Sequence, residues 1–134
     1  MITVGIDIDS SKAIIYAVKF INGAFDNING DFKTIVLHDE YDNSQIREFQ
    51  STIHSFFDTI KPNRIGIIKR NAKGKFASSP TSFKLEGLIQ TYLSCDVEFV
   101  SPQTLTAFYK TNSFIVPSNK YQVNASKLAQ YLVS

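Results

Sequence analysis

Hydrophobic and polar residues alternate from the start of the chain, with the period of a β-strand. Over residues 2–9, one face carries Ile2, Val4, Ile6 and Ile8, and the other carries Thr3, Gly5, Asp7 and Asp9. After a short polar turn, residues 13–20 are rich in β-branched and aromatic residues and predict a second strand, paired with the first as a hairpin. A loop rich in Asn and Gly covers residues 22–31, and residues 32–39 predict a third strand.

The period changes to that of a helix after residue 43. Apolar residues then recur at spacings of three and four: Ile46, Phe49, Ile53, Phe56, Phe57 and Ile60. Asp42, three residues before Gln45, resembles a capping box, and Pro62 is expected to end the helix. Residues 64–68 then predict a short apolar strand.

Two Ser-Pro pairs predict the starts of two further helices. Ser79-Pro80 and Ser101-Pro102 each combine a Ser N-cap with Pro at the first helical position. The first of these helices has an expected buried face of Leu85, Leu88, Ile89, Tyr92 and Leu93. The second is expected to run to about residue 110. A strand over residues 97–100 separates the two, and residues 121–133 predict a last helix.

The order of these elements predicts a mixed α/β fold. Three antiparallel strands precede βαβ crossovers, which gives a mixed sheet with helices on both faces. A length of 134 residues fits one domain over residues 1–134. A hydrophobic content of 43% with 19% charged residues excludes a disordered chain.

Composition limits the partners and the location that we expect. The formal net charge of +2 is too small to indicate a nucleic-acid or membrane partner by itself, so such an argument must rest on a local cluster of charge. Cys95 is the only cysteine, so no intramolecular disulfide can form and a reducing cytoplasm is the expected location. The longest apolar stretch, residues 13–18, is too short to cross a bilayer, and we expect no signal peptide.

The opening Gly5-Ile6-Asp7 and the order of elements resemble the ribonuclease H-like superfamily, in the branch that contains the RuvC-type Holliday-junction resolvases. A more specific resemblance is to a small uncharacterised bacterial family, domain of unknown function 3010. It is carried by Lys-Gly-Lys-Phe-Ala at residues 73–77, Ser82-Phe83-Lys84 and Glu86. The first resemblance implies a ribonuclease H-like fold and a link to nucleic acids, and the second implies no activity.

The superfamily resemblance also implies a site for Mg²⁺ or Mn²⁺. In catalytic members, an Asp on the first strand joins a Glu at the end of the fourth strand and acids on the last helix, and these hold a pair of ions that clamp a phosphodiester. Asp7 matches the first position. The second falls near Lys69, and the last helix offers Asn124, Ser126 and Lys127 in place of acids. A degenerate metal site, at Asp7 alone, is therefore the main expectation.

A replacement set of catalytic acids would consist of Asp7, Asp9 and Glu86. Asp9 lies about 7 Å from Asp7 along the same face of the strand. Glu86 lies on the helix that follows the basic segment. The alternative is a pair of solvated acids at the end of a strand, so the sequence leaves open whether the protein is an enzyme.

Cations are clustered between residues 69 and 75. The cluster consists of Lys69, Arg70, Lys73 and Lys75, and it leads into a helix N-terminus that also favours an anion. Phe76 beside them is suited to stacking on a base. These five residues are candidate contacts for DNA or RNA, and the alternative is an ordinary solvated loop.

Three function hypotheses follow. The first is a domain that binds nucleic acid and has a degenerate metal site, the second is an active Mg²⁺-dependent nuclease, and the third is a protein-interaction module without catalysis. A phosphate loop like that of actin-like ATPases is less compatible with the sequence, because Asp9 stands where those proteins usually have Gly. The Phe-rich helix after residue 43 has an apolar face wide enough for a homodimer contact.

Overall fold

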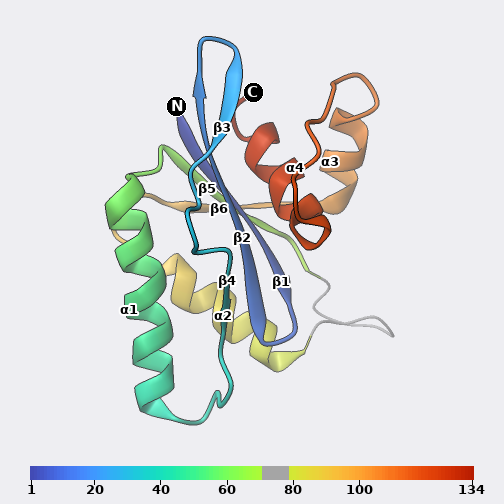
Figure 1. Ribbon diagram of the computed structural model, residues 1–134. Helices are drawn as coiled ribbons and strands as arrows, with labels where there is room; N and C mark the ends of the chain where they lie inside the picture. The colour runs from blue at the N-terminus through green and yellow to red at the C-terminus, as the bar shows by residue number, and fades with distance from the viewer. Residues whose placement is uncertain (71–78) are drawn as a thin grey trace.

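The computed structural model describes residues 1–70 and 79–134, which form a mixed sheet with helices on both sides (Figure 1). The strands are β1 (Ile2–Asp9), β2 (Lys12–Ile21), β3 (Ala24–Asn27), β4 (Thr34–Val36), β5 (Arg64–Ile68) and β6 (Val97–Val100). The helices are α1 (Asn43–Ile60), α2 (Pro80–Gln90), α3 (Pro102–Phe108) and α4 (Val123–Tyr131), with a 3-10 turn over Lys120–Gln122. Among the described residues, the sheet order is β3-β2-β1-β5-β6, and β4 also pairs with β2.

Strands β1 and β2 form the predicted hairpin, in a register that pairs Ile2 with Lys19 and Asp9 with Lys12. Ser10 in the tight turn has a φ of 57°, in the left-handed region. β1 also pairs with β5 in parallel, and β5 pairs with β6 in parallel. The carboxyl ends of β1, β5 and β6 therefore meet along one edge of the sheet.

The sequence prediction for the third strand was wrong in its extent. Instead of one strand over residues 32–39, two short strands pair with different parts of β2: β3 with its end and β4 with its beginning. Asn29 lies between them and is 4% exposed. Its side chain accepts a hydrogen bond from the Ala17 N–H and donates to the carbonyls of Ile15 and Phe32. One buried amide thus replaces part of the hydrogen-bond ladder, which the loop-like composition of this segment did not indicate.

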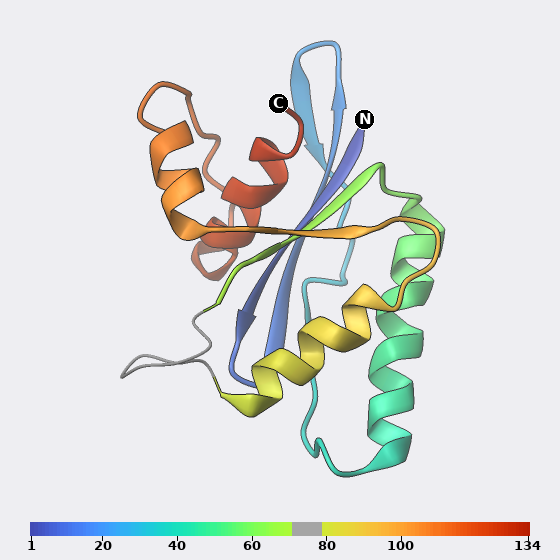
Figure 2. The same cartoon turned by 180° about the vertical axis from the view of Figure 1, so that it is seen from behind.

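Helices α1 and α2 cover one face of the sheet (Figures 1 and 2). Their buried residues pack with the apolar faces of β1, β2 and β5 in the main core: Phe49, Ile53 and Phe57 from α1, and Leu85 and Ile89 from α2. The predicted capping box forms only in part. The Asp42 side chain accepts from the Ser44 N–H, but Gln45 accepts from the Asp39 N–H instead of that of Asp42.

Helices α3 and α4 cover the opposite face (Figure 2). Leu105, Leu128 and Leu132 pack there with Ile68 and Val100. Helix α4 lies very close to β1. A Cβ atom on Gly5 would come within 2.1 Å of the Ala125 carbonyl oxygen, so only glycine fits at this position. Thr3, two residues earlier, donates a hydrogen bond to the Ala129 carbonyl.

Three helix ends differ from the sequence predictions. Helix α3 ends at Phe108, short of residue 110, and the last helix begins as a 3-10 turn before α4. Helix α2 ends at Gln90, so Leu93 lies beyond it and is 96% exposed, not buried as predicted. Helix periodicity places a residue on a face only as far as the helix continues, and the sequence has no strong stop signal after Gln90.

None of the helices in the described ranges is both long and apolar enough to span a membrane.

Candidate nucleic-acid interface

Three residues that the sequence singled out lie at the edge where the parallel strands end. Asp7 is near the end of β1, and Lys69 and Arg70 directly follow β5. We call this group the Asp7 edge. The parallel pairing of β1 with β5 brings these residues together although they are far apart in the chain. In open α/β sheets, ligands bind at the carboxyl ends of the strands.

Asp7 and Arg70 form an ion pair. A guanidinium nitrogen of Arg70 lies 3.7 Å from Asp7 Oδ1, and the two side chains are only 22% and 17% exposed. Burial raises the pKa of the Asp7 carboxyl, while Arg70 and a hydrogen bond from Asn124 of α4 lower it, and Asp9 raises it. Burial has the largest effect, so Asp7 is a carboxyl whose ionised form is costly and depends on Arg70 and Asn124.

Glu86 is a second buried carboxyl near the same guanidinium. It lies on α2 and is 8% exposed, and its Oε2 has no hydrogen-bond partner among the described residues. Burial raises the pKa of Glu86, and the charge of Arg70 lowers it. Arg70 is therefore close enough to Asp7 and Glu86 to favour the ionised form of both.

A helix cap and one hydrogen bond to the β1–β2 hairpin position the start of α2. Ser79 caps the helix by accepting from the Ser82 N–H, as the Ser-Pro pair predicted. The Ser82 hydroxyl donates to the Ser10 carbonyl in the turn after β1, at 3.0 Å. These bonds place Glu86, one helical turn later, on the side of the sheet edge.

The other predicted site residues differ in what the structure says of them. Asp9 and Lys69 are exposed. The Lys69 backbone is fixed to β6, because its N–H donates to the Val100 carbonyl. Lys73, Lys75 and Phe76 lie outside the described residues, so their proposed contacts with nucleic acid stay predictions.

The Asp7 edge does not have the donor set of a two-metal centre. Among residues 1–70 and 79–134, no group of three or more His, Cys, Asp or Glu side chains could hold a metal ion. A hard divalent ion needs several oxygen ligands, and a cation already lies against Asp7. The described residues therefore do not fit the metal pair that the superfamily resemblance implied.

Sequence reasoning missed the roles of Arg70 and Asn124 as partners of Asp7. The signal was present, because both occupy regions where the superfamily pattern calls for acids, and a guanidinium or an amide there can bind a carboxylate. The sequence could not show that the two approach the same carboxyl group.

Solved structures similar to this chain show its fold. Thermus thermophilus RuvC matches with a TM-score of 0.66 and 10% identity, over 98% of this chain and 93% of RuvC. The same RuvC in complex with a Holliday junction substrate matches with a TM-score of 0.71 and 9% identity, over 99% of this chain and 94% of RuvC. An exopolyphosphatase from Cytophaga hutchinsonii matches less well, with a TM-score of 0.50, 8% identity, and coverage of 77% of this chain and 35% of the enzyme.

At these identities the likeness concerns the fold, and it confirms the predicted ribonuclease H-like class. A family model matches residues 1–132, so the chain belongs to the family described as "Protein of unknown function (DUF3010)". This confirms the second resemblance. No curated protein sequence matches the chain.

Proposed function

We propose that this protein binds the phosphate backbone of a nucleic acid at the Asp7 edge, with Arg70 in the role that a metal ion has in the catalytic relatives. The observation that carries the proposal is the position of Arg70, which pairs with Asp7 at 3.7 Å and whose charge opposes the rise that burial causes in the pKa of Asp7 and of Glu86. Ligands of open α/β sheets bind at the carboxyl ends of the strands. RuvC, which shares the fold, was solved with a Holliday junction substrate, and this likeness supports a nucleic acid as the ligand.

Charge neutralisation is the physical step. Two carboxylates at a sheet edge repel a phosphodiester, and a divalent ion is the usual remedy. A guanidinium held against one of them and near the other offsets that repulsion without a metal. Lys69, exposed beside Arg70, then contributes a phosphate contact. Lys73, Lys75 and Phe76 belong to the proposal as further contacts to the backbone and to a base.

Binding measured by fluorescence anisotropy tests this proposal. The probes are a labelled four-way junction, a duplex, a single strand and an RNA of equal length, each titrated over a range of salt concentrations. We expect the protein to bind at low salt. In Lys69→Gln, the slope of log affinity against log salt concentration should become smaller in magnitude by about 1. Lys19→Gln is the matched control, because Lys19 is exposed near the opposite end of β1 and β2. The double variant Lys73→Gln/Lys75→Gln tests the remaining lysines in the same way.

Asp7→Asn separates this proposal from the nuclease hypothesis. If Arg70 neutralises a repelling carboxylate, removing that carboxylate raises affinity for the nucleic acid. A nuclease that uses Asp7, Asp9 and Glu86 with Mg²⁺ or Mn²⁺ would instead cleave one of the probes, and the same variant would abolish cleavage. Metal-dependent cleavage would overturn the proposal in favour of the enzyme. If the protein binds none of the probes at low salt, the proposal is wrong and the protein-interaction module is the remaining hypothesis.

A further inference from the structure

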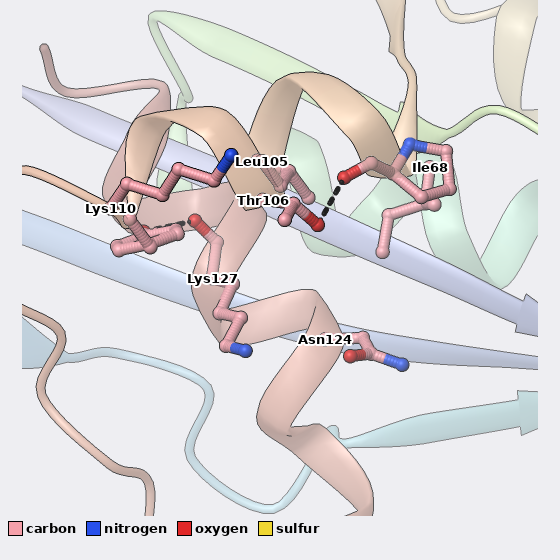
Figure 3. A pocket seen from close by; sticks show the side chains of 8 residues that line it. Ile68, Leu105, Thr106, Lys110, Asn124 and Lys127 are labelled. Carbon is pink, nitrogen blue, oxygen red and sulfur yellow. Dashed lines mark hydrogen bonds between the residues drawn. The ribbon is translucent and has the colours of Figure 1, made fainter.

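A pocket opens between α3 and α4 (Figure 3). Its volume is about 380 Å³, within the range of about 300–1,000 Å³ that is usual for small-molecule sites. Ile68, the last residue of β5, contributes to its lining and is followed directly by Lys69 and Arg70. Asn124 lines it as well and donates the hydrogen bond to Asp7. The pocket and the Asp7 edge therefore share one wall.

The floor of this α3–α4 pocket is apolar and aromatic. Ile68 and Leu105 are 8% and 6% exposed, and the Tyr109 ring lies beside them. The Tyr109 hydroxyl donates to the Lys127 carbonyl, which fixes the ring between the two helices. Burial raises the pKa of Tyr109 to about 12, so the ring stays neutral at physiological pH. Such a floor suits a flat apolar group.

The rim is cationic. Figure 3 shows Lys110 on the α3 side of the pocket and Lys127 with Asn124 on α4. Lys127 Nζ lies 5.5 Å from the centroid of the Phe114 ring, which limits where its long side chain can go. Two lysines and no acid are present among the described lining residues. An apolar floor under a cationic rim selects an anion with a flat apolar body.

We propose that the α3–α4 pocket takes one unpaired nucleotide of a nucleic-acid strand, its base on Ile68, Leu105 and Tyr109 and its phosphate at Lys110 and Lys127. The inference rests on the proposed function, because the neighbouring Asp7 edge binds the backbone of the same strand. Every base has an apolar face, so this site tolerates any sequence. A base in a duplex has its faces covered by stacking, so the pocket favours a single strand or an unpaired junction nucleotide over a duplex.

Filling the pocket tests the inference. Thr106 is exposed on α3 and lines the pocket, and Thr106→Trp introduces a large side chain there without altering charge. Ala107→Trp is the matched control, because Ala107 is the next exposed residue of α3 and is not among the lining residues. The probes are a single strand with one 2-aminopurine, the matched duplex, and adenosine monophosphate. Anisotropy and 2-aminopurine emission are measured for the strand and duplex, and thermal shift for the monophosphate.

We expect 2-aminopurine emission to change when the wild-type protein binds the single strand. Thr106→Trp should lower single-strand affinity about tenfold, the loss of one base contact of ~1.4 kcal/mol, and leave duplex affinity unchanged. Ala107→Trp should change neither. Lys110→Gln/Lys127→Gln should reduce the salt slope for the single strand by about 2. If the two Trp variants bind the single strand equally well and 2-aminopurine emission does not change on binding, the pocket does not take a base. Backbone binding at the Asp7 edge would then still stand.

The monophosphate distinguishes a strand from a free nucleotide. If no nucleic acid binds but adenosine monophosphate raises the melting temperature of the wild type and of Ala107→Trp, and not that of Thr106→Trp, the pocket serves a free nucleotide and the proposed function is wrong. If neither strand nor monophosphate binds, both proposals are wrong. Circular dichroism of each variant shows that loss of binding is not loss of fold.

Discussion

The guanidinium of Arg70 lies 3.7 Å from the carboxylate of Asp7, and both side chains are largely buried at the carboxyl end of the parallel strands. The charge of the same guanidinium opposes the rise that burial causes in the pKa of Glu86, a carboxyl of α2 with an oxygen that has no hydrogen-bond partner among the described residues. The charge of Arg70 thus favours the ionised form of two buried carboxyl groups. This arrangement predicts how each residue affects stability.

Arg70→Gln is expected to lower the free energy of unfolding by about 2 kcal/mol, because it leaves a buried carboxylate without its counterion. Asp7→Asn is expected to leave stability at neutral pH unchanged or higher, because it removes the cost of burying a charge. Urea denaturation of both variants and of the double variant forms a double-mutant cycle. Arg70→Gln should lower the free energy of unfolding less in the Asp7→Asn background than in the wild type. An equal cost in both backgrounds would show that the two residues do not interact.

Glu86→Gln is expected to flatten the dependence of stability on pH. The pKa of Glu86 is raised above its ordinary 4.5 in the folded protein, so the folded state binds the proton more tightly than the unfolded state. Stability is therefore lost as the pH rises from about 4.5 through the folded pKa, and it is regained on acidification. The pKa of Asp7 is also raised above its ordinary 3.8, so Asp7 likewise makes the protein less stable as the pH rises above about 3.8.

Denaturant midpoints between about pH 4 and pH 8 check this prediction. The wild type should lose stability relative to Glu86→Gln as the pH rises through this range. Glu48→Gln on the exposed surface of α1 is the control and should run parallel to the wild type. A Glu86→Gln curve parallel to the wild type would mean that Glu86 titrates alike in the folded and unfolded states.

Gly5→Ala is expected to destabilise the protein by more than about 3 kcal/mol, because the added methyl overlaps backbone atoms that cannot move aside. Its Cβ would lie 2.1 Å from the Ala125 carbonyl oxygen and 2.6 Å from the Ala129 nitrogen. Gly87→Ala is the matched control. Nothing lies within 4 Å of its added Cβ, and in the interior of α2 it should stabilise by up to about 1 kcal/mol. Thermal denaturation should move the two variants in opposite directions.

Asn29→Ala is expected to lower the free energy of unfolding by about 3 kcal/mol. The buried N–H of Ala17 loses its acceptor, and the Phe32 carbonyl loses the Asn29 donor. Asn112→Ala, at an exposed amide that donates to the Phe108 carbonyl, should change stability by less than about 0.5 kcal/mol. Hydrogen exchange at Ala17 is the most direct measurement. A small loss of stability with unchanged protection there would show that the Asn29 side chain does not secure the segment between β3 and β4 to β2.

The sequence by itself determined the strands and helices whose signals are local. Alternation over β1, the helical spacing of α1 and the Ser-Pro starts of α2 and α3 all came from neighbouring residues, and the structure confirms them. Asp7 could be assigned to the sheet edge for the same reason, since it lies near the end of a clearly alternating strand. The split edge strand and the early end of α2 were missed, because a single buried amide and an unmarked helix end leave little local signal.

Only the tertiary structure decided what surrounds Asp7. Arg70 and Asn124 come from different parts of the chain, and parallel pairing of β1 with β5 and packing of α4 on Gly5 bring them to Asp7. Docking of α2 on the hairpin brings Glu86 within reach of the charge of the same Arg70. The α3–α4 pocket likewise exists only because two helices far apart in sequence from β5 pack beside its end. Charge and burial act through distance in space, and spacing along the chain does not determine that distance.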